Sequence, residues 1–111
     1  MIRIALVSAG LVLWAAGAFA QGNAAHGKQL FTDNKCAVCH SIAGTGNKKG
    51  PLDDVGSKLS GGDIRQWITS APEMAAKAKA DRKPPMKAYD ALAKDEVDDL
   101  VAYLSTLKGK K

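Results

Sequence analysis

The chain has 111 residues, a formal net charge of +5 at pH 7, two cysteines and few aromatic residues. A chain of this length forms one small domain, which buries a limited fraction of its surface and often depends on a metal, disulfide or cofactor. The basic stretch from Lys77 to Lys87 contains no aromatic residue, and this composition argues against nucleic acid as a partner.

The first twenty residues have the pattern of a secretory signal peptide. Arg3 supplies the positive start, residues 4–16 the apolar core, and Ala18-Phe19-Ala20 a small-x-small cleavage site. We therefore predict that residues 1–20 are cleaved and that residues 21–111 form a mature domain in the periplasm, without stable membrane insertion. An uncleaved membrane anchor is the alternative, because the apolar stretch approaches the roughly 20 residues that span a bilayer.

The mature chain begins with a predicted helix over about residues 24–34. Asn23 is a suitable N-cap, and Gly27, Leu30 and Phe31 recur at the spacing of a packed helix face.

Residues 36–40, Cys-Ala-Val-Cys-His, match C-x-x-C-H, the sequence at which haem is attached covalently in c-type cytochromes. Cysteines three positions apart lie on one side of a helical turn, within reach of His40. We predict one covalent haem c, bonded through Cys36 and Cys39, with His40 as the first axial ligand of iron. A thioredoxin-like dithiol or a structural zinc site is less consistent with the chain, which lacks a visible βαβ unit and a grouped fourth ligand.

The rest of the mature chain also has a helical pattern, after a loop marked by Gly44, Gly46, Asn47 and Gly50-Pro51. A short helix is predicted over about 63–70, and Pro72 opens a further turn that ends before Pro84-Pro85. The clearest helix covers about 95–107, with acidic residues near its start and Gly109 as its stop. No segment alternates like a strand, so the fold class is all-α.

The second axial ligand defines what the iron does, because a filled site favours electron transfer and an open one favours gas binding or catalysis. Met86 is the best candidate, since it lies in a loop stiffened by Pro84-Pro85 where a methionine has little else to pack against. Met74 lies in a helical segment where core packing is expected. His26 is expected to be a surface or packing residue.

With these features in this order along the chain, residues 22–108 resemble the small class I cytochromes c. The resemblance implies a cytochrome c fold of three to five helices wrapped around one covalently bound haem. In that family the first and last helices cross where a glycine allows close approach and aromatic residues pack. Gly27, Phe31, Leu100 and Tyr103 match those positions.

The resemblance also assigns Pro51 and Trp67 to the cofactor site. The backbone carbonyl of Pro51 would accept a hydrogen bond from His40, which orients the ring and raises its basicity as a ligand. The indole N–H of Trp67 would bind a haem propionate, with plain packing as the alternative. The chain departs from the family at Lys87, where proline is common, and at Lys94, where a Ser or Thr often caps the last helix.

The resulting functional expectation is an electron carrier of a respiratory chain, not an enzyme, acting as a monomer or as a subunit of a redox complex. Lysines including Lys49, Lys83 and Lys87 are expected to steer acidic redox partner proteins. Two alternatives remain: a bound cytochrome c subunit of a periplasmic oxidoreductase, and a gas-binding or sensor haem protein in which Met86 does not bind iron.

Overall fold

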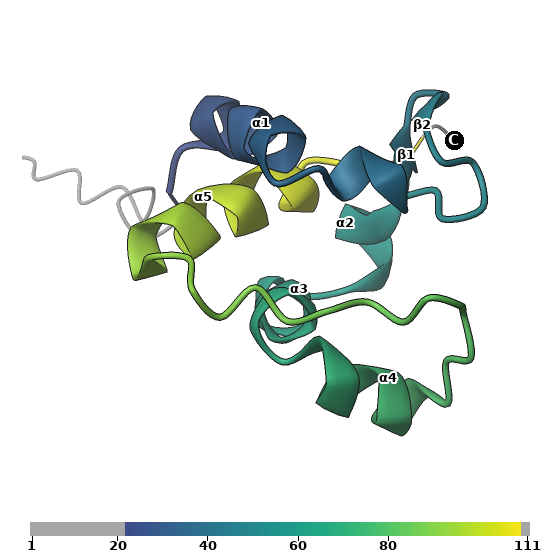
Figure 1. Cartoon of the computed structure of the whole chain (residues 1–111). Helices are drawn as coiled ribbons and strands as arrows, with labels where there is room; N and C mark the ends of the chain where they lie inside the picture. The colour runs from purple at the N-terminus through teal and green to yellow at the C-terminus, as the bar shows by residue number, and fades with distance from the viewer. Residues whose placement is uncertain (1–21, 110–111) are drawn as a thin grey trace, which may run out of the picture.

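The computed structural model describes residues 22–109, so the predicted signal peptide at residues 1–20 lies outside the described residues. The described part is mainly helical, which confirms the predicted all-α fold class (Figure 1). Its elements in chain order are α1 (Ala24–Asp33), the 3-10 helix η2 (Cys36–Val38), β1 (Ser41–Ile42), β2 (Thr45–Gly46), α2 (Val55–Lys58), α3 (Gly61–Thr69), α4 (Ala71–Ala78) and α5 (Lys94–Ser105). The antiparallel hairpin β1–β2 was not expected, because two residues a strand are too few to show alternation.

The N-terminal ends of the helices follow from specific polar contacts. The Asn23 side chain accepts a hydrogen bond from the His26 backbone N–H at 3.0 Å, which confirms the predicted cap of α1. The Ser60 hydroxyl accepts from the Asp63 N–H at 3.1 Å, so α3 begins two residues earlier than predicted. At α5 the N-cap is Ala93, whose N–H donates to Glu96 at 2.9 Å, and the expectation that Lys94 fills the cap position was wrong by one residue.

The last helix ends earlier than its apolar pattern predicts. It stops at Ser105, with Thr106 as the C-cap, and the Thr106 hydroxyl donates to the Tyr103 carbonyl at 2.6 Å. Gly109 is therefore not the helix stop, although its backbone is left-handed with φ 66°. The carbonyl of Leu107, in the segment that follows α5, instead accepts a hydrogen bond from the Gly56 N–H at 2.7 Å. This bond joins α2 to that segment.

The core lies where α1 and α3 pack against α5. Its buried residues are Leu30, Phe31, Ile64, Ile68, Val97, Leu100 and Leu104. Phe31 and Tyr103 meet edge to face, with ring centroids 6.2 Å apart and planes inclined by 69°. The aromatic contact at the crossing of the first and last helices is thus confirmed.

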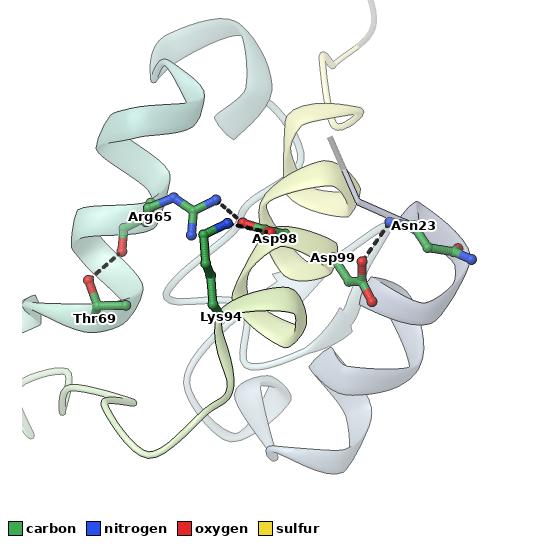
Figure 2. Close-up of polar contacts among 6 residues, drawn as sticks. All are labelled: Asn23, Arg65, Thr69, Lys94, Asp98 and Asp99. Carbon is green, nitrogen blue, oxygen red and sulfur yellow. Dashed lines mark hydrogen bonds and ion pairs between the residues drawn. The ribbon is translucent and has the colours of Figure 1, made fainter. Parts of the chain in front are cut away.

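Polar contacts along α5 hold the neighbouring helices to it (Figure 2). The Asp98 carboxylate pairs with Arg65 of α3 and, at 3.0 Å, with Lys94 one turn earlier. The Asp99 carboxylate accepts from the Asn23 N–H at 2.6 Å and pairs with His26 of α1 at 2.6 Å. His26 is therefore a surface residue that joins α1 to α5, in keeping with its predicted role.

A long segment without regular structure runs from the end of α4 back to α5 and carries Met86 (Figure 1). The backbone N–H of Tyr89 donates to the Ile68 carbonyl at 2.7 Å, which ties this segment to the end of α3.

Among the helices that the structure describes, none has both the length and the apolar character needed to cross a membrane.

Candidate haem-attachment site

The Cys-Ala-Val-Cys-His motif forms a tight turn between α1 and β1. The N–H groups of Cys39 and His40 both donate to the Cys36 carbonyl, at 3.1 and 2.9 Å. Lys35, immediately before the turn, has a left-handed backbone with φ 58°, which redirects the chain after α1. Both cysteines are free thiols and half-buried. The turn therefore keeps two thiols and one imidazole within a five-residue segment.

Asn47 holds this turn in place, and sequence reasoning noted it only as part of a loop. Its backbone N–H lies 3.0 Å from the Ala37 carbonyl and 3.1 Å from the His40 carbonyl, and its side-chain amide donates to the Val38 carbonyl at 3.1 Å. The preceding residue is Gly46, with φ 108°, where a Cβ atom would collide with the His40 carbonyl. The Gly-Asn pair was the available signal, because a close backbone approach requires glycine.

The ring of His40 is oriented by the carbonyl of Gly50, not by that of Pro51. Its Nδ1 lies 3.0 Å from the Gly50 oxygen, and since a carbonyl only accepts, Nδ1 must carry the proton. The assignment to Pro51 was wrong by one residue. Nε2 is the remaining ring nitrogen, with its lone pair free to bind a metal.

His40 meets the Gly50 carbonyl, and not that of Pro51, because of how the backbone of residues 50–52 pairs with Ser41. Pro51 lies opposite Ser41 in a parallel bridge. The Ser41 N–H donates to the Gly50 carbonyl at 3.1 Å, and the Leu52 N–H donates to the Ser41 carbonyl at 2.8 Å. In such a bridge the residues on either side of Pro51 make the hydrogen bonds, while its own nitrogen and carbonyl face away, a position that suits a residue without an N–H. Pro51 therefore contributes to the site by fixing the position of the Gly50 carbonyl, which accepts the hydrogen bond from His40.

Burial sets the protonation of the motif side chains. Burial lowers the pKa of His40, Arg82 nearby lowers it further, and the hydrogen bond to Gly50 acts in the opposite direction. Burial also raises the pKa of the Cys36 thiol to about 11, although Lys87 opposes the increase. His40 is thus favoured in the neutral form that binds metals.

Met86 is half-buried, and the residues on either side of it approach the motif. Arg82 acts electrostatically on His40, and Lys87 acts on Cys36. Residues 87–92 also line a cavity of about 500 Å³ together with residues 33–35, which directly precede Cys36. The structure therefore brings the Met86 segment and the motif together, whereas axial ligation by Met86 stays a prediction.

The other sequence candidates lie on helices. Trp67 is half-buried on α3, beside the buried Ile68, and its proposed contact with a propionate stays a prediction. Met74 is half-buried on α4. Within residues 22–109, no three His, Cys, Asp or Glu side chains gather closely enough to hold a metal ion by themselves.

The residues around the motif fit a large apolar cofactor. No large side chain among residues 22–109 is completely buried. Apolar side chains that border the core keep part of their surface exposed, among them Leu52, Val55, Leu59 and Leu92. A flat hydrophobic group bonded to the two thiols would cover such surface, and burial of apolar area stabilises a fold by about 25 cal/mol per Å². The donor set of two thiols and a neutral imidazole suits haem c.

Comparisons with known proteins agree with this chemistry. A family model described as "Cytochrome c" matches residues 24–108. Cytochrome c oxidase subunit 2 of Alkalihalophilus pseudofirmus is 29% identical over 91 aligned residues, covering 74% of this chain and 25% of the relative. The chain thus spans about a quarter of that relative's length. No solved structure matches the chain significantly.

Proposed function

Because the chain belongs to the cytochrome c family, we propose that it is a periplasmic one-electron carrier with a single haem c bonded to Cys36 and Cys39. Bound haem would supply the couple between Fe(II) and Fe(III), so no general acid or base is required of the protein. The observation that carries the proposal is the His40 ring, whose Nδ1 is bound to the Gly50 carbonyl at 3.0 Å, leaving Nε2 for iron.

The proposal includes Met86 as the second axial ligand. Its support is the stiff segment around Pro84-Pro85 and the position of the Arg82 guanidinium against Gly50, whose carbonyl holds His40. A thioether raises the reduction potential and closes the sixth position of iron. Such a filled site favours electron transfer over gas binding.

The proposed partners are redox proteins with acidic surfaces. Lys49, Lys83 and Lys87 are exposed, and Val38 within the motif turn is 66% exposed. A small interface that combines exposed apolar surface with exposed lysines suits a brief encounter, in which charge speeds association more than it adds affinity.

A second candidate is a bound subunit of a periplasmic oxidoreductase. The relative that matches most of this chain is named as an oxidase subunit, although the matched region is only a quarter of it. A larger protein that stays bound during purification in high salt would favour this candidate, because screened encounter complexes separate under those conditions.

Export is proposed from the sequence of residues 1–20 alone. Mass spectrometry of the protein recovered from a periplasm tests it, since cleavage after Ala20 leaves a chain that begins at Gln21. An intact N-terminus in the membrane fraction would show the anchor instead.

The deciding experiment is the visible spectrum of the mature protein made in a periplasm with haem-attachment machinery. We expect haem that stays bound on denaturation and, in the ferric state, the weak long-wavelength band of iron–methionine ligation. Met86→Ala should remove this band and Met74→Ala should keep it. Rapid, complete binding of carbon monoxide by the ferrous wild-type protein at neutral pH would contradict a stable Met86 ligand.

A further inference from the structure

Met86 lies in a segment whose backbone has few attachments to the rest of the molecule. The N–H of Ala80 makes its last backbone hydrogen bond to α4, and the next along the chain is the one from Tyr89 to Ile68. Between these two points, over residues 81–88, no backbone group is hydrogen-bonded to another backbone group. Backbone without such bonds opens at a low cost in free energy. Side chains must therefore hold Met86 in place.

Arg82 is the side chain that attaches the first half of this segment. Residues 76–81 and 83–85 are all exposed, whereas Arg82 is half-buried. None of the ion pairs among residues 22–109 includes Arg82. An acidic side chain therefore does not explain why this cation is partly removed from water, and the explanation lies in its other neighbours.

Those neighbours belong to the backbone that supports His40. A Cβ atom at residue 50 would collide with the Arg82 guanidinium and with the Cys39 carbonyl, so only glycine leaves room for both groups. A guanidinium only donates hydrogen bonds and a carbonyl only accepts them, so the two groups attract one another. The carbonyl of the same Gly50 holds the His40 ring at 3.0 Å. Arg82 thus joins the Met86 segment to the residues that orient His40.

The other end of the segment is anchored by Tyr89. Its N–H donates to the Ile68 carbonyl at 2.7 Å, and its half-buried ring packs against the core. The Lys87 Nζ lies 5.0 Å from the centroid of that ring. Met86 therefore lies between two anchors, after Arg82 and before Tyr89. A group that is already restrained on both sides loses less conformational freedom when it binds, which strengthens a weak ligand.

We propose that Arg82 is a positioning residue for Met86, an inference that rests on the proposed function. Arg82 acts without touching the iron, by keeping the segment closed against Gly50 so that the thioether stays in place. Loss of this anchor raises the population in which the segment is open and another ligand can enter. The chemistry of the methionine is unchanged, because its side chain is still present.

The test is titration of the ferric, haem-loaded protein with imidazole, a small ligand that must displace Met86 to reach the iron. Loss of the long-wavelength iron–methionine band reports the displacement. Arg82→Gln should bind imidazole about threefold more tightly than wild type, or more, because residues in contact are energetically coupled to that extent. Arg82→Lys should lie between the two, since it keeps a cation and loses the planar guanidinium, and it provides the same comparison if Arg82→Gln does not fold.

Two control variants separate this role from a lost charge and from a general loss of stability. Lys77→Gln removes one exposed charge from α4 and should bind imidazole like wild type. Gly27→Ala disturbs the packing of α1 against α5, because a Cβ atom there would collide with the Asp99 carbonyl. It should lower the urea midpoint and leave the affinity for imidazole close to that of wild type.

Either of two results would overturn the inference alone. One is an affinity of Arg82→Gln equal to that of Lys77→Gln, while the wild type has covalent haem and the methionine band, so that the proposed function stands. The other is an affinity of Gly27→Ala raised as much as that of Arg82→Gln. A wild type with covalent haem and no methionine band would overturn Met86 ligation together with the inference, and absence of covalent haem would overturn the proposed function as well.

Discussion

Gly27 of α1 lies directly against the backbone carbonyl of Asp99 in α5. A Cβ atom at this position would collide with that carbonyl and come within 2.8 Å of the Tyr103 Cβ. The absence of a side chain therefore sets how closely the two helices approach. Phe31 and Tyr103 pack beside the same crossing at 6.2 Å.

The first prediction concerns this crossing. Gly27→Ala should lower the free energy of unfolding by about 1–3 kcal/mol, because overpacking forces two backbones apart. The measurement is urea denaturation of the haem-loaded protein. Gly62→Ala on α3 is the control, since its nearest neighbouring atom would be 3.9 Å away, and it should leave stability within about 1 kcal/mol of wild type. Equal losses in both variants would disprove the steric explanation.

The second prediction concerns the motif turn. Asn47→Ala removes two hydrogen bonds, one from its amide to the Val38 carbonyl at 3.1 Å and one from the Lys49 N–H to its side chain at 2.9 Å. The expected loss of stability is about 1–3 kcal/mol in total, with a lower yield of covalent haem. Denaturation and pyridine haem spectra measure the two effects. Lys48→Ala, at an exposed neighbouring position, should change neither, and an equal loss there would contradict the role of Asn47.

The third prediction follows from the pair of His26 and Asp99, which joins α1 to α5 at 2.6 Å. The hydrogen bond to Asp99 raises the pKa of His26, and the hydrogen bond from His26 lowers the pKa of Asp99. A raised histidine pKa adds stability that is full below its unfolded value near 6.5 and is lost as pH rises through the folded value. A lowered aspartate pKa adds stability above about 3.8 that is lost in acid.

The wild type should therefore exceed His26→Gln in urea midpoint most clearly between about pH 4.5 and 6.5. The difference should shrink on both sides of this window, and it should be modest because the His26 side chain is 50% exposed. Urea titrations at several pH values check this. A constant difference from pH 5 to pH 9 would show that the charged pair has no role.

The fourth prediction concerns steering by exposed lysines. Oxidation of the ferrous protein by ferricyanide should slow as salt rises, because the Debye length falls from about 30 Å at 0.01 M to about 10 Å at 0.1 M. With a cationic oxidant of higher potential, tris(1,10-phenanthroline)cobalt(III), the dependence should reverse. Lys87→Gln should weaken both trends more than Lys108→Gln, which lies beyond α5. Stopped-flow rates measure this, and the same slope for both oxidants would refute steering.

The local sequence pattern was sufficient to predict much of this fold. The Asn23 cap, the helices near residues 24–34 and 95–107, and the all-α class depend on neighbours within a few positions, and all agree with the structure. Helix ends were less predictable: the Ser60 hydroxyl caps α3 two residues before its predicted start, and α5 ends at Ser105, before the predicted residue 107. Helix α2 has four residues, too few for apolar periodicity to appear.

By itself, the sequence showed the C-x-x-C-H motif and predicted His40 and Met86 as axial ligands, because each depends on residue type and short spacing. Only the tertiary structure decided which carbonyl orients His40 and which cation lies beside Gly50. The direction of a carbonyl depends on which segments pair, here Ser41 with Pro51 in an isolated bridge. The reach of Arg82 depends on how the Met86 segment returns toward Gly50. Such contacts join residues far apart in the chain, where spacing carries no information.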